Sequence, residues 1–422
     1  MKNYLILLQL LLSLAVAPLL QASQPDIEQR PLTLRGQIIA GDTQQPLINA
    51  TITAESFNIS SVTNQEGKFV LRLPIAAQEA EVTVRHLGYE NRTLAVSTLL
   101  QSSQEIILQP STITLGTLEV VKGDGTQLVR DALQRIPYNY PAEPEMMVAF
   151  YRESIKKGSN HISLVEAVLD IYKSSYRSYS DDQAKIYIGR KATDVSPRDT
   201  LLLKFQGGIS TALMLDVAKY PDILLGEKGE DYAFAIEGMV HINNKPHYAI
   251  QFKPLPGIED ILFRGTIYLD AATLAFARVE FNMNVEGRKD AASVFIRRRP
   301  SKMRADIEEA RYIIDFAEHD GKWHFNYSNT EVRFRIRWTN RLFGLFSTVY
   351  TISSEMAMTD RYDEGITRFP RKERIRSSDV IAEKVEHFTD PDFWGDYNVI
   401  EPDIEISRAI KRLSGRLSRR NQ

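Results

Sequence analysis

The feature that most constrains this chain is a strict alternation of apolar and charged side chains. Residues 332–338 interleave two sets: Val332, Phe334, Ile336 and Trp338, and between them Arg333, Arg335 and Arg337. Successive side chains of a strand point to opposite faces, so this run predicts a β-strand with one buried and one solvated face. Weaker alternation at 232–236 and 248–252 predicts further strands of the same kind.

Turn residues connect these runs into hairpins. Residues 263–269 and 274–281 flank a turn at 270–273, and Asp320-Gly321 follows a run that starts at Tyr312. Such hairpins predict a large antiparallel sheet. Apolar residues at helical spacing add a helix at 208–219 and another at 404–417. The fold class expected is therefore mainly β or α+β, with few helices.

Composition excludes several classes of function. The chain has 422 residues, which predicts two or three domains. It has no cysteine, which excludes disulfides, thiolate metal sites, iron–sulfur clusters and cysteine nucleophiles. The net charge of −2 gives no sign of a nucleic-acid partner. We expect no cofactor.

The N-terminus has the pattern of a signal peptide over residues 1–22. Lys2 precedes an apolar run from Tyr4 to Leu20, and Ala22 is the expected cleavage residue. The alternative is an uncleaved membrane anchor, which the shortness of the run disfavours. No cysteine follows for a lipid anchor, and no later segment is apolar enough to span a membrane as a helix. We expect a periplasmic or outer-membrane-associated protein.

Residues 30–110 contain about seven short strands separated by turn residues, which predicts a β-sandwich. Four motifs occur in order: Gly36-Gln-Ile, Pro46-Leu-Ile-Asn-Ala-Thr-Ile52, Thr63-Asn-Gln-Glu-Gly-Lys-Phe69 and His86-Leu-Gly-Tyr89. Together they resemble the carboxypeptidase regulatory-like domain. The resemblance implies a transthyretin-like sandwich that is an accessory module without catalysis. In Bacteroidota-type envelope proteins, such a module often precedes other exported domains.

The rest of the chain divides into three parts. Residues 111–144 are expected to form a linker with a strand at 115–121 and a short helix at 126–136. Residues 145–400 form the antiparallel β-rich domain, whose first and last segments resemble an uncharacterised region found behind this module in Bacteroidota proteins. Its long sheet with few helices resembles the LolA-type half-barrel in architecture only. Residues 401–422 are expected to form a basic helix.

No motif for catalysis or metal binding is complete. None of the seven histidines precedes a glutamate by three positions, as a zinc peptidase would require. Ser210 lacks the second glycine of a nucleophile elbow, because Ala212 stands there. His241 and His247 flank a hairpin turn, and we favour a solvated pair over a metal site because a third ligand is missing. We therefore assign no catalytic, cofactor-binding or metal-ligating residue.

Two surfaces are candidates for binding. The first is an apolar strand face made of Tyr248, Ile250, Phe252, Ile267, Leu269, Val279 and Phe281. It is either a groove for a lipid-like ligand or ordinary core covered by the helices at 208–219 and 404–417. The second is the face of Arg333, Arg335 and Arg337, which either meets an anionic partner such as lipid phosphates or is neutralised by nearby acids.

Together these patterns favour an exported envelope protein that binds or assembles without catalysis. The sandwich would dock, and the β domain would hold an envelope protein or a lipid-like ligand, with peripheral association with the outer membrane. The alternative is an envelope hydrolase acting on glycan or peptide. An apolar groove would favour the carrier, and a wet cleft with clustered carboxylates or histidines would favour the enzyme.

Processing of the leader is directly testable. We expect the mature chain to start near Ser23 in the periplasmic or outer-membrane fraction, because the apolar run ends just before Ala22. N-terminal sequencing of the fractionated protein checks this. An intact Met1 in the cytoplasmic fraction would contradict it.

Overall fold

The computed structural model describes residues 31–101, 103–111, 124–193, 208–226, 231–242, 244–285, 288, 291–295, 303–338, 347–387 and 393–420. The expected signal peptide and the expected strand at 115–121 lie outside these residues. The described helices include none that is long and apolar enough to cross a membrane. Within this part of the chain, hydrogen bonding joins the strands into a three-stranded sheet and a 15-stranded sheet.

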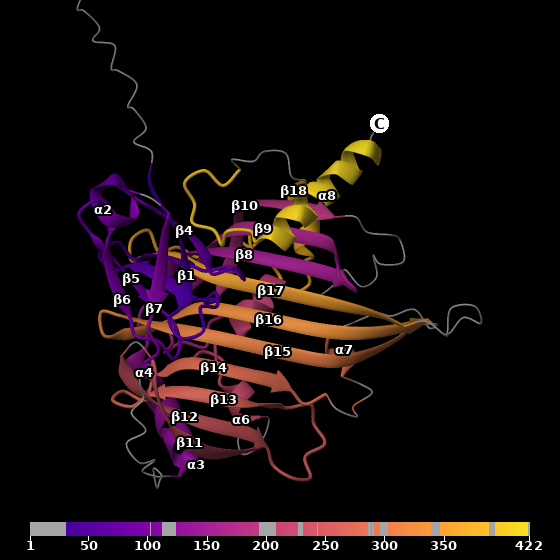
Figure 1. Cartoon of the computed structure of the whole chain (residues 1–422). Helices are drawn as coiled ribbons and strands as arrows, with labels where there is room; N and C mark the ends of the chain where they lie inside the picture. Colours follow the sequence, from indigo (N-terminus) through magenta and orange to yellow (C-terminus); the bar gives the residue numbers. More distant parts are fainter. Residues whose placement is uncertain are drawn as a thin grey trace, which may run out of the picture.

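The N-terminal unit is a β-sandwich, as predicted (Figure 1). One layer has the strand order β4-β1-β7, and the other has the order β3-β2-β5-β6. The strands are β1 (Leu32–Ala40), β2 (Thr51–Ala54), β3 (Ile59–Val62), β4 (Lys68–Leu73), β5 (Glu81–Arg85), β6 (Arg92–Ala95) and β7 (Gln104–Leu108). A short helix, α2 (Val96–Leu99), and two 3-10 helices, η1 (Glu55–Phe57) and η2 (Ile75–Ala77), complete it.

Two motifs of this unit have clear structural reasons. Phe69 is fully buried, and a Cβ at Gly36 would lie 2.7 Å from its ring. Glycine therefore leaves the space that the ring fills. The buried Thr63 hydroxyl donates to the carbonyl of Leu47 at 2.6 Å and accepts from the amide of Ala50 at 2.8 Å. These two hydrogen bonds hold the loop before β2 against the end of β3.

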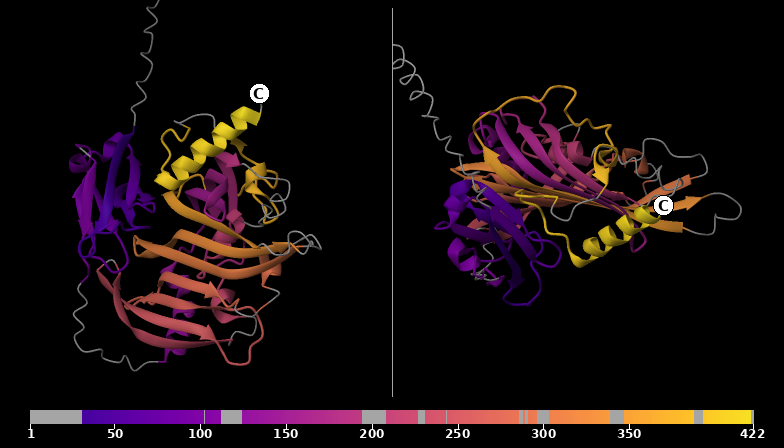
Figure 2. Two further views of the ribbon diagram at one scale, coloured as in Figure 1. Left: turned by 45° about the vertical axis from the view of Figure 1, so that its right-hand side comes forward. Right: turned by 90° about the horizontal axis from the view of Figure 1, so that it is seen from above.

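The second unit is a long curled sheet with the strand order β11-β12-β13-β14-β15-β16-β17-β8-β9-β10 (Figures 1 and 2). Every pair in that order is antiparallel, and β18 (Glu386–His387) adds a short parallel pair to β10. The strands are β8 (Glu145–Lys157), β9 (Asn160–Lys173), β10 (Gln183–Thr193), β11 (Tyr232–Ile242), β12 (Lys245–Pro254), β13 (Phe263–Asp270), β14 (Phe276–Met283), β15 (Met303–His319), β16 (Lys322–Trp338) and β17 (Ser347–Tyr362). The two predicted hairpins are confirmed as β13–β14 and β15–β16.

Short helices pack on the inner face of this sheet, which we define as the face that carries the main hydrophobic core. They are α3 (Gly125–Gln134), α4 (Ile136–Asn139), α5 (Gly208–Met214), α6 (Asp222–Leu225) and α7 (Ala292–Phe295), and a 3-10 helix, η3 (Ile381–Glu383), lies near β18. The segment expected to be a linker helix thus contributes Val129, Ala132 and Ile136 to the core of the sheet.

Two helix expectations need correction. The helix predicted over 208–219 ends at Met214, because the Asp216 carboxylate accepts the amides of Ala218 and Lys219 and turns the chain. The C-terminal helix α8 (Ile404–Arg420) does not cover the apolar face of β12–β14. It packs against β9 and β10, on the same side of the sheet as the sandwich (Figure 2, right).

A row of aromatic rings crosses the inner face of β12, β14 and β15. Phe252 and Phe281 lie 6.5 Å apart, and Phe281 stacks on Tyr312 at 4.9 Å. Gly265 of β13 pairs with both Phe252 and Phe281. A Cβ there would lie 1.9 Å from the Glu280 carbonyl oxygen and 2.6 Å from the Phe281 Cα. The aromatic row therefore depends on a residue without a side chain at this position.

The substitution Gly265→Ala tests this close approach. We expect it to lower the free energy of unfolding by about 1–3 kcal/mol, because the added methyl forces two strands apart. Thermal and urea unfolding measure the change. Lys253→Ala, at an exposed position of the neighbouring strand, is the control and should change stability by less than about 0.5 kcal/mol. Equal stability of both variants would contradict the packing argument.

Candidate functional site

The structure places a cleft of about 710 Å³ on the outer face of the sheet. Three separate parts of the chain form it. The floor comes from β8, β16 and β17, one wall comes from loops of the sandwich around Asn49 and Asn64, and the opposite wall comes from residues 400–406. Since these parts are far apart in sequence, the cleft is a product of the tertiary fold alone.

Side chains of alternate residues line the floor in three rows across the strands. Each row takes one residue from β16, one from β17 and one from β8, in hydrogen-bond register. The rows are Asn329–Glu355–Arg152, Glu331–Ser353–Ser154 and Arg333–Thr351–Lys156. Nearly every group is a hydroxyl, an amide or a charge. The floor therefore offers hydrogen bonds to a ligand rather than an apolar surface.

Arg152 is the anchor of this site. Its Nε donates to Glu166 at 2.9 Å, its Nη1 to Glu355 at 2.9 Å, and its Nη2 to the carbonyl of Ile400 at 2.6 Å. The side chain of Arg152 is 4% exposed and that of Glu166 is fully buried. Arg190 donates to the other Glu166 oxygen at 2.9 Å and lies over the Trp394 ring at 4.6 Å. The two arginines satisfy a carboxylate that could not otherwise be buried.

The C-terminal strap, residues 393–403, lies between the sheet and the sandwich and joins them. Asn398 exchanges two hydrogen bonds with the backbone of Arg72, at 2.7 and 3.0 Å. Asn64 donates to the carbonyl of Glu401 at 3.0 Å. Strand β3 also pairs with β17 at Ile59 and Asp360. Sandwich, strap and sheet are therefore held as one body around the cleft.

Most carboxylates of the cleft already have partners. Glu355 accepts from Arg152, although burial raises the pKa of this carboxyl above its usual range. Asp403 accepts the amide of Ile406 at 2.7 Å and so caps α8. Glu405 pairs with Lys156 at 2.9 Å, and that contact lowers its pKa. These groups are positioned to shape the cleft rather than to exchange protons.

His161 is a buried imidazole on the wall of the cleft. It is 6% exposed and faces Lys156 across β8 and β9. Burial, together with the charge of Lys156, lowers its pKa to about 4, so the ring is neutral at pH 7. Neither ring nitrogen has a hydrogen-bond partner among the described residues. Both nitrogens are inaccessible to solvent, and Nε2 lies 4.0 Å from a Glu405 oxygen, so the ring packs in the wall of the cleft.

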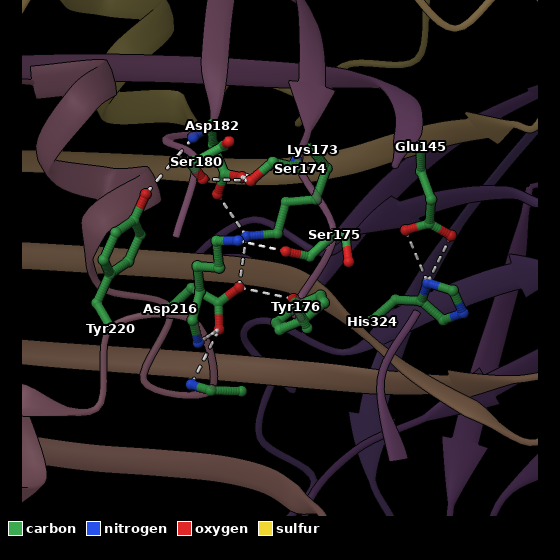
Figure 3. Close-up of polar contacts among 12 residues, drawn as sticks. Glu145, Lys173, Ser174, Ser175, Tyr176, Ser180, Asp182, Asp216, Tyr220 and His324 are labelled. Atoms are coloured by element: carbon green, nitrogen blue, oxygen red, sulfur yellow. Dashed lines mark hydrogen bonds and ion pairs between the residues drawn. The ribbon is translucent and has the colours of Figure 1, made fainter. Parts of the chain in front are cut away.

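A second polar cluster lies inside the fold (Figure 3). The Lys173 ammonium lies 2.5 Å from Asp182 and 2.6 Å from Asp216, and Tyr176 donates to Asp216 at 2.6 Å. Burial opposes the charged form of Lys173, but the two carboxylates hold its pKa above the usual range. These charged side chains are at most 1% exposed, so the cluster braces the end of β9 rather than meeting a ligand.

The described histidines that the sequence singled out lie beside single carboxylates or apart from other potential ligands. His324 pairs with Glu145 at 3.0 Å (Figure 3), and His247 lies 3.9 Å from Asp270. His241 aligns with Pro246 and not with His247, so the two histidines do not face each other across the hairpin. No group of three or more potential metal ligands occurs among the described residues. Ser210 lies on α5, in a helix as expected.

The predicted apolar face lies in the interior. Tyr248 is half-buried and packs against the main core, and the other six residues belong to that core: Ile250, Phe252, Ile267, Leu269, Val279 and Phe281. Tyr140 of the segment after α4 covers part of this region by accepting the amide of Phe276 at 2.9 Å. A ligand role for this face remains a prediction.

The predicted arginine face lies on the outer surface and is largely neutralised by acids of β15. Arg337 pairs with Asp306 at 2.6 Å, and Arg335 pairs with Glu308. Arg333 is 3.6 Å from Glu308 and reaches the cleft. The compensation matches the solvated-face interpretation, and an anionic partner for these three residues remains a prediction.

Apart from Arg333, the residues that build the cleft were not predicted from the sequence. Arg152, Glu166 and Glu355 are charged residues on strands whose pattern is otherwise apolar. One feature of the sequence could have indicated these residues. A charged residue within a long buried strand must be paired with another polar group, because an unpaired buried charge is costly. The partner itself could not be identified, since Glu355 lies 203 residues away from Arg152.

Residues 34–121 match the CarboxypepD_reg-like domain family, which confirms the resemblance inferred for the first unit. No curated protein matches the chain. Similar solved structures include a domain named for outer membrane lipoprotein sorting from Vibrio parahaemolyticus, with 12% identity, a TM-score of 0.26, and coverage of 58% of this chain and 94% of that one. A DUF1329 family protein from Desulfovibrio piger has 14% identity, a TM-score of 0.28, and coverage of 58% and 96%.

A LolA superfamily protein from Nitrosomonas europaea has 10% identity, a TM-score of 0.19, and coverage of 58% of this chain and 98% of that one. TM-scores this low carry no argument about what the chain binds.

Glu153 is an acid on the opposite face of β8 from the cleft. Tyr151 donates to it at 3.0 Å, and Gly208 of α5 lies against both side chains. Burial raises the pKa of Glu153 to about 7, and the hydrogen bond from Tyr151 offsets this only in part. The folded protein therefore holds this proton at pH values where the unfolded chain has lost it.

The raised pKa of Glu153 predicts the direction in which the free energy of unfolding changes with pH. Between pH 4.5 and about 7 the folded chain keeps a proton on Glu153 that the unfolded chain has lost, so the contribution of this group to stability falls as pH rises. The fall should total about 3 kcal/mol. His161 acts in the opposite direction, because its lowered pKa makes stability rise with pH up to about 6.5. The effect of Glu153 is therefore measured as the difference between wild type and Glu153→Gln in urea unfolding at pH 5 and pH 8, with the exposed Glu331→Gln as control. The variant should gain most of the roughly 3 kcal/mol relative to wild type at the higher pH, and a difference that is the same at both pH values would refute the assignment.

Proposed function

We propose that this chain is a non-catalytic binding protein of the bacterial cell envelope, and that its cleft binds a hydrophilic, extended polypeptide segment of a partner. The observation that carries this proposal is the cleft itself. Three strands present rows of hydroxyl, amide and charged groups, and the sandwich and the strap form walls beside them. The envelope location rests on the leader sequence and on the match to the CarboxypepD_reg-like family.

The lining favours a polypeptide over a small molecule. Small-molecule sites are mostly apolar, with a few polar groups. Here, most lining residues are polar or charged, and the aliphatic ones are Ile48, Val349, Ile400 and Ile406. Charges of both signs follow one another along the floor, which suits a chain of mixed charge. The composition resembles a transient protein interface.

The same geometry favours binding over catalysis. Hydrolysis of a glycan or a peptide needs an acid and a base free to exchange protons near the substrate. In the cleft, Glu355, Asp403 and Glu405 each hold a structural partner, and Glu331 is exposed without a second free carboxylate among the described lining residues. His161, with its pKa of about 4, is a weak base at pH 7.

The test uses the chain from Ser23 onward, which keeps every described residue. Random peptides displayed on phage are depleted on a Ser353→Trp variant and then selected on the wild type. Ser353 lies at the centre of the floor, 2.8 Å from Ser154, so an indole there fills the cleft. We expect selected peptides to bind the wild type at least about tenfold more tightly than the variant.

Lys253→Trp places the same indole on an exposed position outside the cleft and should leave peptide affinity unchanged. Circular dichroism confirms that both variants fold. Peptides that bind all three proteins equally would refute the cleft as the site. Cleavage of peptide or peptidoglycan by the wild type, lost in Glu355→Gln, would establish the hydrolase instead.

A further inference from the structure

Helix α8 carries an excess of positive charge that is unusual in this chain. Its residues 404–420 contain one acid, Glu405, and six basic residues: Arg408, Lys411, Arg412, Arg416, Arg419 and Arg420. The chain as a whole has a net charge of −2. Residues 404–420 therefore have a net charge of +5 in a chain that is close to neutral overall.

The first half of α8 is fixed by its apolar side. Ile406, Ala409 and Leu413 are buried, and the helix contacts β9 and β10. Arg412 ties it to the β8–β9 hairpin by donating to Asn160 at 2.9 Å and to the carbonyl of His161 at 2.5 Å. Because the apolar side of α8 packs on the sheet, Arg408 and Lys411 face solvent.

Arg408 interacts electrostatically with Glu66 and Glu405, but neither Arg408 nor Lys411 is bound directly to an acid among the described residues. Together with Ser407 and Lys68 of the sandwich, they line a hollow of about 380 Å³. The acids at its rim are already engaged: Glu66 pairs with Lys68 at 2.8 Å, and Glu401 pairs with Arg35 at 3.0 Å. No ion pair joins Arg408 or Lys411 to a carboxylate in the part of the chain that the structure describes. The arginines of β16 differ, since acids of β15 compensate them.

The position of α8 leaves this charge accessible. The helix starts beside the sandwich and runs outward along the top of the sheet, and its C-terminal end projects past the strands (Figures 1 and 2). The sequence places Arg416, Arg419 and Arg420 on this projecting end. A straight rod with basic residues along its length matches a flat array of negative charges better than it matches a compact ligand.

We propose that α8 binds the anionic phospholipid headgroups of a bilayer surface, and so holds the protein at a membrane without insertion. The attraction is electrostatic, because the apolar side of α8 stays packed on the sheet. Each basic residue near an anionic surface raises partitioning by about fivefold. The proposal is independent of what the cleft binds.

The experiment is co-sedimentation of the chain from Ser23 onward with lipid vesicles. Vesicles of phosphatidylcholine alone are compared with vesicles that contain about one third phosphatidylglycerol. We expect binding to the anionic vesicles to be at least about 100-fold stronger, and to be lost at about 0.5 M salt because charges are then screened. Inorganic phosphate at millimolar concentration should not compete, which separates a lipid surface from a free phosphate ligand.

The decisive variant replaces four basic residues of α8: Arg408→Gln, Lys411→Gln, Arg416→Gln and Arg419→Gln. It should lose about 100-fold or more in partitioning. The matched control replaces four basic residues exposed elsewhere: Lys253→Gln, Arg311→Gln, Arg371→Gln and Lys372→Gln. It should bind like the wild type. Equal loss in both variants, equal binding to both vesicle types, or binding to polyglutamate but not to anionic vesicles would each overturn the proposal.

Discussion

The buried ion network around Arg152 is the interaction on which the outer half of the molecule depends. Arg152 lies on β8 and donates to a carboxylate of β9, to a carboxylate of β17 and to the backbone carbonyl of Ile400 in the strap. A buried arginine of this kind is tolerated only when the N–H groups of its planar guanidinium all have hydrogen-bond partners. Removal of any of these partners would leave a buried charge without compensation. The network therefore fixes the strap on the sheet.

The two faces of the curled sheet have opposite chemistry because its strands alternate. On β8, Tyr151 points into the main core, and Arg152 and Ser154 point to the cleft. On β16, Val332 and Phe334 enter the core while Arg333 reaches the cleft. One period-two pattern therefore supplies both the hydrophobic stabilisation of the fold and the polar floor of the candidate site.

The sandwich contributes to the site through its loops rather than its core. Its own core is separate from that of the sheet, as expected for an accessory module. Its contacts with the rest of the chain include specific polar ones, such as the bond from Tyr327 to Asn49 at 3.1 Å and the two bonds between Asn398 and Arg72. Val62 adds an apolar contact, in a cluster with residues of the sheet and the strap. The module thus acts as one wall of a cleft whose floor belongs to another unit.

The sequence by itself determined the local features of this protein. Alternation and turn residues predicted the sandwich, the hairpins at Asp270 and Asp320, and helix α8, because each depends on residues close together in the chain. The extent of α5 was wrong, since a tertiary contact of Asp216 ends that helix early.

The tertiary structure alone decided which polar residues meet. The Arg152 side chain and the Ile400 carbonyl are 248 positions apart, and the rows of the cleft join strands from both halves of the second unit. The tertiary structure also decided that the apolar face of β12–β14 is interior. Part of the cover of this face is the segment after α3, which local sequence patterns had assigned to a linker. Local periodicity fixes which face of a strand is apolar, but only the packing of distant segments decides what lies against that face.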